Sequence, residues 1–111
     1  MRIECTRQGN VVILRPRGLL AGADADALKA QLDNVMHDGP AQVVLDCSSI
    51  LFVDSHGLEV LVEMAESIIR DGNTLKLAGA NPTLQEVLEL TDVATLFELS
   101  TDVKAAVGSC Q

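Results

Sequence analysis

Residues 43–58 read VVLDCSSILFVDSHGL, and within this stretch the pattern changes from a buried strand to a helix. Val43–Asp46 is short, apolar and rich in β-branched residues, which predicts a strand covered on both faces. Residues 47–53 are expected to form a short loop. From Asp54 an amphipathic run continues to Arg70, and its i, i+3, i+4 spacing predicts a helix that buries five residues: Leu58, Leu61, Met64, Ala65 and Ile68.

One serine, Ser55, lies in the first turn of this predicted helix. The first N–H groups of a helix have no partner within it, and the helix dipole places positive potential there. Ser55 can therefore be an ordinary N-cap or small loop residue, or its hydroxyl can carry a phosphate that the helix end stabilises. A phosphate would add about −1.5 to −2 charges. It would change the charge of an exposed surface more readily than it would unfold the domain.

The whole chain, residues 1–111, is predicted to form a single α/β domain. Five strands are expected, at residues 2–6, 11–14, 43–46, 74–78 and 96–98. The helices are expected at about 24–37, from 54 to 70, from Asn81-Pro82 onward, and at about 101–107. This order predicts a mixed sheet of four to five strands, parallel in its later part, with about four packed helices. A tail from about residue 108 is expected to be flexible.

Turn and breaker residues set the expected boundaries near the N-terminus. Gly9-Asn10 is typical of a two-residue hairpin turn between the first two strands. Pro16 is expected to end the second strand, because proline cannot donate to a ladder. Gly18–Ala23 is then expected to be a flexible connection to the first helix.

The composition limits the classes of partner. The net charge of −8 disfavours binding to a nucleic-acid backbone or to anionic lipid. Two aromatic residues are too few for the stacking platforms of single-strand nucleic-acid binders. No apolar run is long enough to span a bilayer, and early polar residues interrupt any signal-peptide core. We therefore expect a cytoplasmic protein with no nucleic-acid partner and no direct membrane insertion.

The residues that could support metal or nucleophilic chemistry are not spaced for it. The three cysteines are odd in number and far apart, and Cys5 and Cys47 are expected to be buried in strands. Asp54, Ser55 and His56 are the residue types of a hydrolase triad, but adjacent side chains diverge and cannot align. No stretch has the pattern of a phosphate-binding loop. We expect no enzyme, no cofactor and no metal site.

The stretch 43–58 resembles the signature of STAS domains, the fold of bacterial anti-sigma-factor antagonists. The family pattern is a hydrophobic strand, then Asp-x-Ser, a few apolar residues, and Asp-Ser-Ser/Thr-Gly-Leu; here these elements are Asp46-Cys47-Ser48 and Asp54-Ser55-His56-Gly57-Leu58. The resemblance extends over nearly the whole chain. It includes the opening hairpin, the Arg17-Gly18 connection, the turn at Gly72 and the Asn81-Pro82 helix start.

The resemblance implies a regulatory binding module that switches partners. In this family the unphosphorylated antagonist binds an anti-sigma factor, which is also a serine kinase of the histidine-kinase-like ATPase class. A PP2C-type phosphatase reverses the phosphorylation. By motif position the phosphorylated residue is Ser55. The implied partner-binding residues are Asp54, Ser55, His56, Gly57, Leu58, Glu59, Ala21 and Gly22.

Three positions differ from the usual family pattern. His56 stands where the family usually has Ser or Thr, and Leu19 and Ala21 stand where acidic residues are common. These differences favour an alternative, a structural STAS subunit of a transporter or stress-signalling assembly that is not phosphorylated. Nucleotide binding, sometimes proposed for STAS domains, is a weaker alternative.

Overall fold

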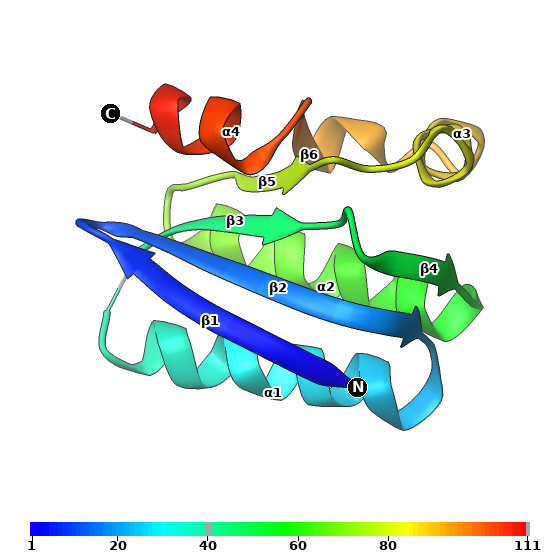
Figure 1. The fold of residues 1–111 in the computed structure, drawn as a ribbon, viewed down its shortest axis with the longest axis horizontal. Coiled ribbons are helices and arrows are strands. Elements are labelled where there is room, and N and C mark those ends of the chain that lie inside the picture. The colour runs from blue at the N-terminus through cyan, green and yellow to red at the C-terminus, as the bar shows by residue number, and fades with distance from the viewer. Residues whose placement is uncertain (40, 111) are drawn as a thin grey trace.

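A computed structural model describes residues 1–39 and 41–110 of the chain (Figure 1). The described residues form six strands: β1 (Arg2–Gln8), β2 (Val11–Leu20), β3 (Gln42–Asp46), β4 (Ile50–Val53), β5 (Leu75–Ala78) and β6 (Phe97–Ser100). They also form four α-helices and one 3-10 turn: α1 (Gly22–His37), α2 (Ser55–Arg70), α3 (Pro82–Leu90), η1 (Ala94–Leu96) and α4 (Val103–Ser109). The predicted α/β class, mixed sheet and four helices are confirmed, but the sheet has six strands rather than four to five.

The strands form one sheet in the order β1-β2-β3-β5-β6, with β4 attached to β2. β1 and β2 form an antiparallel hairpin, and the other pairs are parallel. β2 has two successive partners on the edge away from β1: residues 11–14 pair with β3, and residues 18–20 pair with β4. The ends of β2 and β4 therefore lie side by side, and this position holds the candidate site.

The strand β4 corrects the expectation of a loop at residues 47–53. A four-residue apolar run cannot be assigned from periodicity alone, because buried strands and buried irregular segments look alike at this length. Its pairing depends on Gly18, whose φ of 111° lies in the left-handed region that favours glycine. The Gly18 N–H donates to the Ser49 carbonyl at 3.0 Å, and the register of β2 shifts between Gly18 and Leu19.

Pro16 does not end β2 as predicted, because it lies between the two parallel partners of that strand. β2 pairs with β3 as far as Leu14 and with β4 from Gly18. The Gly18 N–H points to the β4 side, and N–H groups two residues apart in a strand point the same way. The nitrogen of Pro16 therefore faces the interval between β3 and β4, where its missing hydrogen removes no ladder bond.

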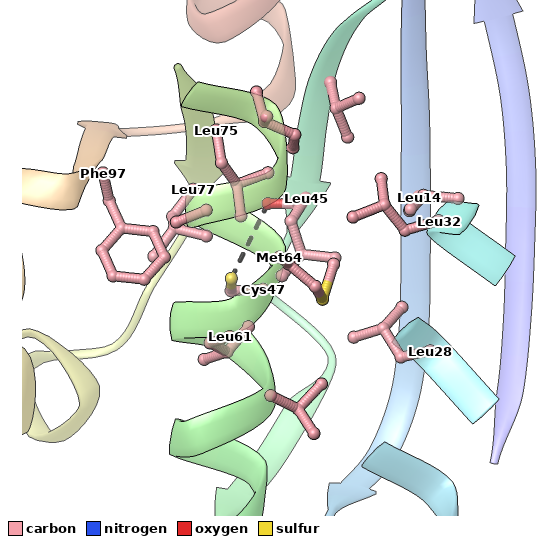
Figure 2. Packing of buried hydrophobic residues seen from close by; sticks show 14 of the residues in the cluster. Leu14, Leu28, Leu32, Leu45, Cys47, Leu61, Met64, Leu75, Leu77 and Phe97 are labelled. Atoms are coloured by element: carbon pink, nitrogen blue, oxygen red, sulfur yellow. Dashed lines mark hydrogen bonds between the residues drawn. The ribbon is translucent and has the colours of Figure 1, made fainter. Parts of the chain in front are cut away.

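Apolar side chains pack on both faces of the sheet. On one face α1 and α2 lie side by side, and their leucines and Met64 contact β2, β3 and β5 (Figure 2). On the other face α4 covers a smaller cluster: Val11, Ile13, Val44, Ala78, Ala106 and Val107. The core is nearly all aliphatic, with Phe97 buried and Phe52 exposed. Each fully buried Leu or Met contributes about 1.5–3 kcal/mol. No helix within the described ranges is long and apolar enough to cross a bilayer.

The two cysteines that were predicted to be buried differ in their surroundings. Cys47 is buried directly after β3, and its thiol donates to the Leu45 carbonyl at 3.6 Å (Figure 2). Burial, with a smaller contribution from the charge of Asp46, raises the pKa of the Cys47 thiol to about 12, which keeps it protonated at neutral pH. The prediction of a buried Cys5 is wrong, because β1 is an edge strand whose residues from Cys5 onward are exposed.

The helix α4 is joined to the sheet through its last turn. Lys76 on β5 is buried; its Nζ donates to Ser109 Oγ and lies 3.5 Å from the Glu98 carboxylate. Gln42 Nε2 donates to the Cys110 carbonyl at 3.3 Å. Residues 108–110 thus have defined positions, while the flexibility expected from about residue 108 concerns motion and stays a prediction. Gln111 lies outside the described residues.

The first turn of α2 lies directly against the end of β2. The Asp54 N–H donates to the Leu20 carbonyl at 3.3 Å. Gly57 is buried, and a Cβ added there would lie 2.1 Å from the same oxygen and 3.1 Å from the Val53 side chain. Space, rather than backbone conformation, therefore requires glycine at position 57.

We expect Gly57→Ala to destabilise the domain by about 1–3 kcal/mol, the usual cost of overpacking, because the Leu20 backbone cannot move without disturbing β2. Gly108→Ala is the matched control: this glycine is also helical, but an added Cβ meets nothing within 4 Å. The control should be neutral or slightly stabilising through helix propensity. Urea unfolding of both variants tests this, and wild-type stability in Gly57→Ala would contradict it.

Candidate functional site

The helices α1 and α2 begin next to each other at one end of the sheet. α1 follows β2, with Ala21 as its N-cap residue, and α2 follows β4, with Asp54 as its N-cap residue. The strand residues just before these caps, Leu20 and Val53, are paired. The carboxyl ends of parallel strands are where α/β sheets usually bind ligands. The structure thus brings all the predicted partner-binding residues into one region: Ala21, Gly22 and residues 54–59.

Asp54, rather than Ser55, caps α2. Its Oδ1 accepts the Gly57 N–H at 2.6 Å, and its carbonyl accepts the Leu58 N–H at 2.9 Å. Ser55 is the first residue of the helix and is exposed, and no hydrogen bond to its hydroxyl is found in the part of the chain that the structure describes. The N-cap role considered for Ser55 is therefore excluded. Its hydroxyl is open to solvent at the N-terminal end of a 16-residue helix.

A phosphate at this position would meet opposing electrostatic effects. The end of α2 favours a negative charge by about 0.3–1 kcal/mol at an exposed position. Asp54 lies beside Ser55 and Glu59 lies one turn further along the helix, and both carboxylates oppose the phosphate. Because the cap of α2 depends on Asp54 and not on the serine hydroxyl, modification of Ser55 leaves that cap in place.

His56, in the first turn of α2, contacts Asp26 in the second turn of α1. Its Nε2 lies 2.7 Å from Oδ1 of Asp26 on α1. The hydrogen bond to Asp26, followed by the charge of that carboxylate, raises the pKa of His56 above its usual 6.5. The charges of Glu59 and Asp54 act in the same direction, while partial desolvation opposes them. His56 is therefore cationic over a wider pH range, which places positive charge among these carboxylates.

The sequence predictions missed two features of this region: the contact of Asp26 with His56, and the exposure of Leu19 and Phe52. The contact of Asp26 with His56 spans 30 residues and has no signal in local spacing. Leu19 and Phe52 are paired across β2 and β4 and are 52% and 57% exposed. The sequence has no signal for this exposure, because Phe97, the other aromatic residue, is buried.

Comparison with known protein families gives one match that covers almost the whole chain. The model described as "STAS domain" matches residues 2–106. BtrV of Bordetella bronchiseptica, provisionally named an anti-sigma factor antagonist, is 25% identical over 109 residues, which cover 98% of this chain and 94% of that protein.

Solved structures show the same fold. The anti-sigma factor antagonist SpoIIAA in its unphosphorylated form has a TM-score of 0.83 at 14% identity, covering 98% of this chain and 96% of that one. The phosphorylated form of SpoIIAA from Bacillus has a TM-score of 0.80 at 13% identity, with 99% and 100% covered. A sulfate transporter family protein from Wolinella succinogenes has a TM-score of 0.80 at 24% identity, with 94% and 87% covered.

We predict that an NMR pH titration gives His56 a pKa above 6.5, and that Asp26→Asn lowers it because the strongest interaction is lost. Since folding raises the pKa of His56, the pair stabilises the fold fully below about 6.5, and this stabilisation is lost as the pH rises through the folded-state value. The difference in unfolding free energy between wild type and Asp26→Asn should therefore decrease as the pH rises through that value. An unchanged His56 pKa in Asp26→Asn would contradict the prediction.

Proposed function

Since this chain belongs to the STAS domain family, we propose that it is a regulatory binding module of the anti-sigma-factor antagonist type, controlled by phosphorylation of Ser55. The observation that carries the proposal is the position of Ser55. It is exposed, begins α2 without capping it, and lies at the motif position that the family phosphorylates. The provisional name of BtrV supports the same class of function.

The proposed switch acts through surface charge rather than through a change of fold. In the unphosphorylated protein, the start of α2 and residues 21–22 form a docking surface for an anti-sigma factor that is also a serine kinase of the histidine-kinase-like ATPase class. Transfer of a phosphate to Ser55 adds about −1.5 to −2 charges to the middle of that surface. A PP2C-type phosphatase restores the binding form. SpoIIAA supports this mode, because both of its forms match the fold of this chain.

Burial of the added charge is the physical reason for release of the partner. An ion removed from water at an interface costs several kcal/mol unless a partner charge and hydrogen bonds replace its hydration. The carboxylates of Asp54 and Glu59 already make the surface around Ser55 acidic. A partner surface that fits the Ser55 hydroxyl therefore binds the phosphorylated protein more weakly. The module acts by binding in the cytoplasm, without catalysis, a cofactor or a nucleic-acid partner.

A second candidate function is a structural STAS subunit of a transporter or stress-signalling assembly, without phosphorylation. The acidic residues common in the family are absent at Leu19 and Ala21, and His56 is held by Asp26 beside the acceptor serine. The fold match to the sulfate transporter family protein is compatible with this alternative. Affinity capture distinguishes the two: recovery of a kinase-like anti-sigma factor favours switching, and recovery of transporter components favours the structural role.

We predict that incubation with ATP and a kinase of this class from the source organism adds one phosphate, seen by intact-mass measurement. Ser55→Ala should abolish the added mass. Ser49→Ala is the matched control, because Ser49 is also exposed and precedes the same helix, and it should be modified normally. No added mass in the wild type, or an added mass that persists in Ser55→Ala, would remove Ser55 from the mechanism.

We further predict that Ser55→Asp weakens binding to the anti-sigma partner by about tenfold or more, because it places an unpaired charge in the interface. Ser55→Asn is almost the same size without the charge, and its dissociation constant should stay much closer to that of the wild type. Calorimetry measures both. Equal affinities of the Asp and Asn variants would show that charge at position 55 does not control binding.

A further inference from the structure

We propose that a groove between β4 and α3 binds an extended, apolar segment of a partner protein that carries Lys or Arg beside its apolar residues. The groove has a volume of about 230 Å³. One wall consists of all four residues of β4, and the other includes Thr83, Leu84 and Val87 of α3. β4 and α3 lie at the same end of the molecule (Figure 1). This binding goes beyond the proposed function, because it requires neither Ser55 nor its phosphate.

The groove runs along the open edge of a strand. Successive side chains of a strand point to opposite faces, so a cavity lined by four successive residues borders the edge of β4 rather than one face. Among the described strands β4 pairs only with β2, which occupies the other edge. The Asp54 N–H donates to Leu20 of β2, and by alternation the Val53 N–H points away from β2. An added strand would find a backbone donor there.

The residues of this edge include neither the charged side chains nor the proline that protect many edge strands. Natural edge strands are protected by charged residues, by proline or by a covering element. The sequence of β4 is ILFV, and Leu51 and Phe52 are 76% and 57% exposed. Val87, on the opposite wall, is also exposed. An extended peptide pairs its backbone with such an edge and places alternate side chains into the adjoining pocket.

Charge identifies the kind of segment that fits. The residues that line the groove carry no charge, and the charged residues next to them in sequence are all acidic: Asp46, Asp54 and Glu86. Asp54 directly follows the β4 wall, and exposed Glu86 directly precedes Val87 on the α3 wall. Pairing of this edge with a second copy would bring two acidic surfaces together, which disfavours a homodimer. A segment with cations beside its apolar residues is complementary.

The test is a selection of random decapeptides displayed on phage against the immobilised full chain. We expect enriched peptides to have apolar residues at alternate positions with Lys or Arg beside them. Val87→Gln should weaken an enriched synthetic peptide at least about tenfold, the equivalent of 1.4 kcal/mol. Leu90→Gln is the matched control, because Leu90 is an exposed apolar residue of the same helix that does not line the groove; it should change affinity less than about twofold.

Amide hydrogen exchange tests the extended form of the peptide. Binding should slow exchange of the Val53 amide at least about tenfold, because a new strand accepts its N–H. The Asp54 amide, already hydrogen-bonded to the Leu20 carbonyl, is the internal control.

Failure to enrich any peptide, or equal effects of the Val87 and Leu90 substitutions on affinity, would overturn the groove as a binding site. Binding that leaves Val53 exchange unchanged would overturn strand addition and indicate a helical ligand or self-association instead. Ser55→Ala should bind the peptide normally, so this outcome is separate from that of the phosphoswitch.

Discussion

The contact between the Leu20 carbonyl and the first turn of α2 constrains the surrounding structure. This oxygen accepts the Asp54 N–H and lies so close to Gly57 that no side chain fits between them. The contact fixes the end of β4 beside the end of β2 and places the starts of α1 and α2 next to each other. The exposed hydroxyl of Ser55 and the bridge from His56 to Asp26 both follow from that arrangement. A rigid junction is a suitable place for a charge switch, because a modified side chain there changes the surface while the backbone beneath it stays packed.

Most of the fold could be predicted from sequence, and the errors have a common physical cause. The strand at residues 43–46, the helix to Arg70 and the Asn81 cap have strong local signals, and the structure confirms them. The loop prediction for residues 47–53 and the predicted end of β2 at Pro16 were both wrong, because each depends on a partner distant in sequence. β4 exists because β2 changes neighbours at Gly18, and Pro16 is tolerated because it lies at that change. Local patterns contain no information about which strand comes next in the sheet.

The candidate site was predicted as a set of residues but not as a set of contacts. The family motif placed residues 54–59 and 21–22 together, and the fold brings them to one end of the sheet. The motif did not predict that Asp54 would be the cap or that His56 would bind Asp26, since both depend on the three-dimensional meeting of two helix starts. The groove beside β4 could not be predicted either, because its strand had been assigned to a loop. Apolar residues in a short run are usually core, and only the structure shows that Leu51 and Phe52 are exposed.

The pairing of β2 with three other strands also sets the order in which the chain can fold. Its hairpin with β1 is local in sequence and can close before any later element is present. Its parallel partners come later, because β3 follows the whole of α1 and β4 ends only at Val53. Until then the apolar edge of β2 on a nascent chain is uncovered and open to wrong pairings. Residues 50–53 therefore complete the sheet environment of β2 as well as forming one wall of a groove.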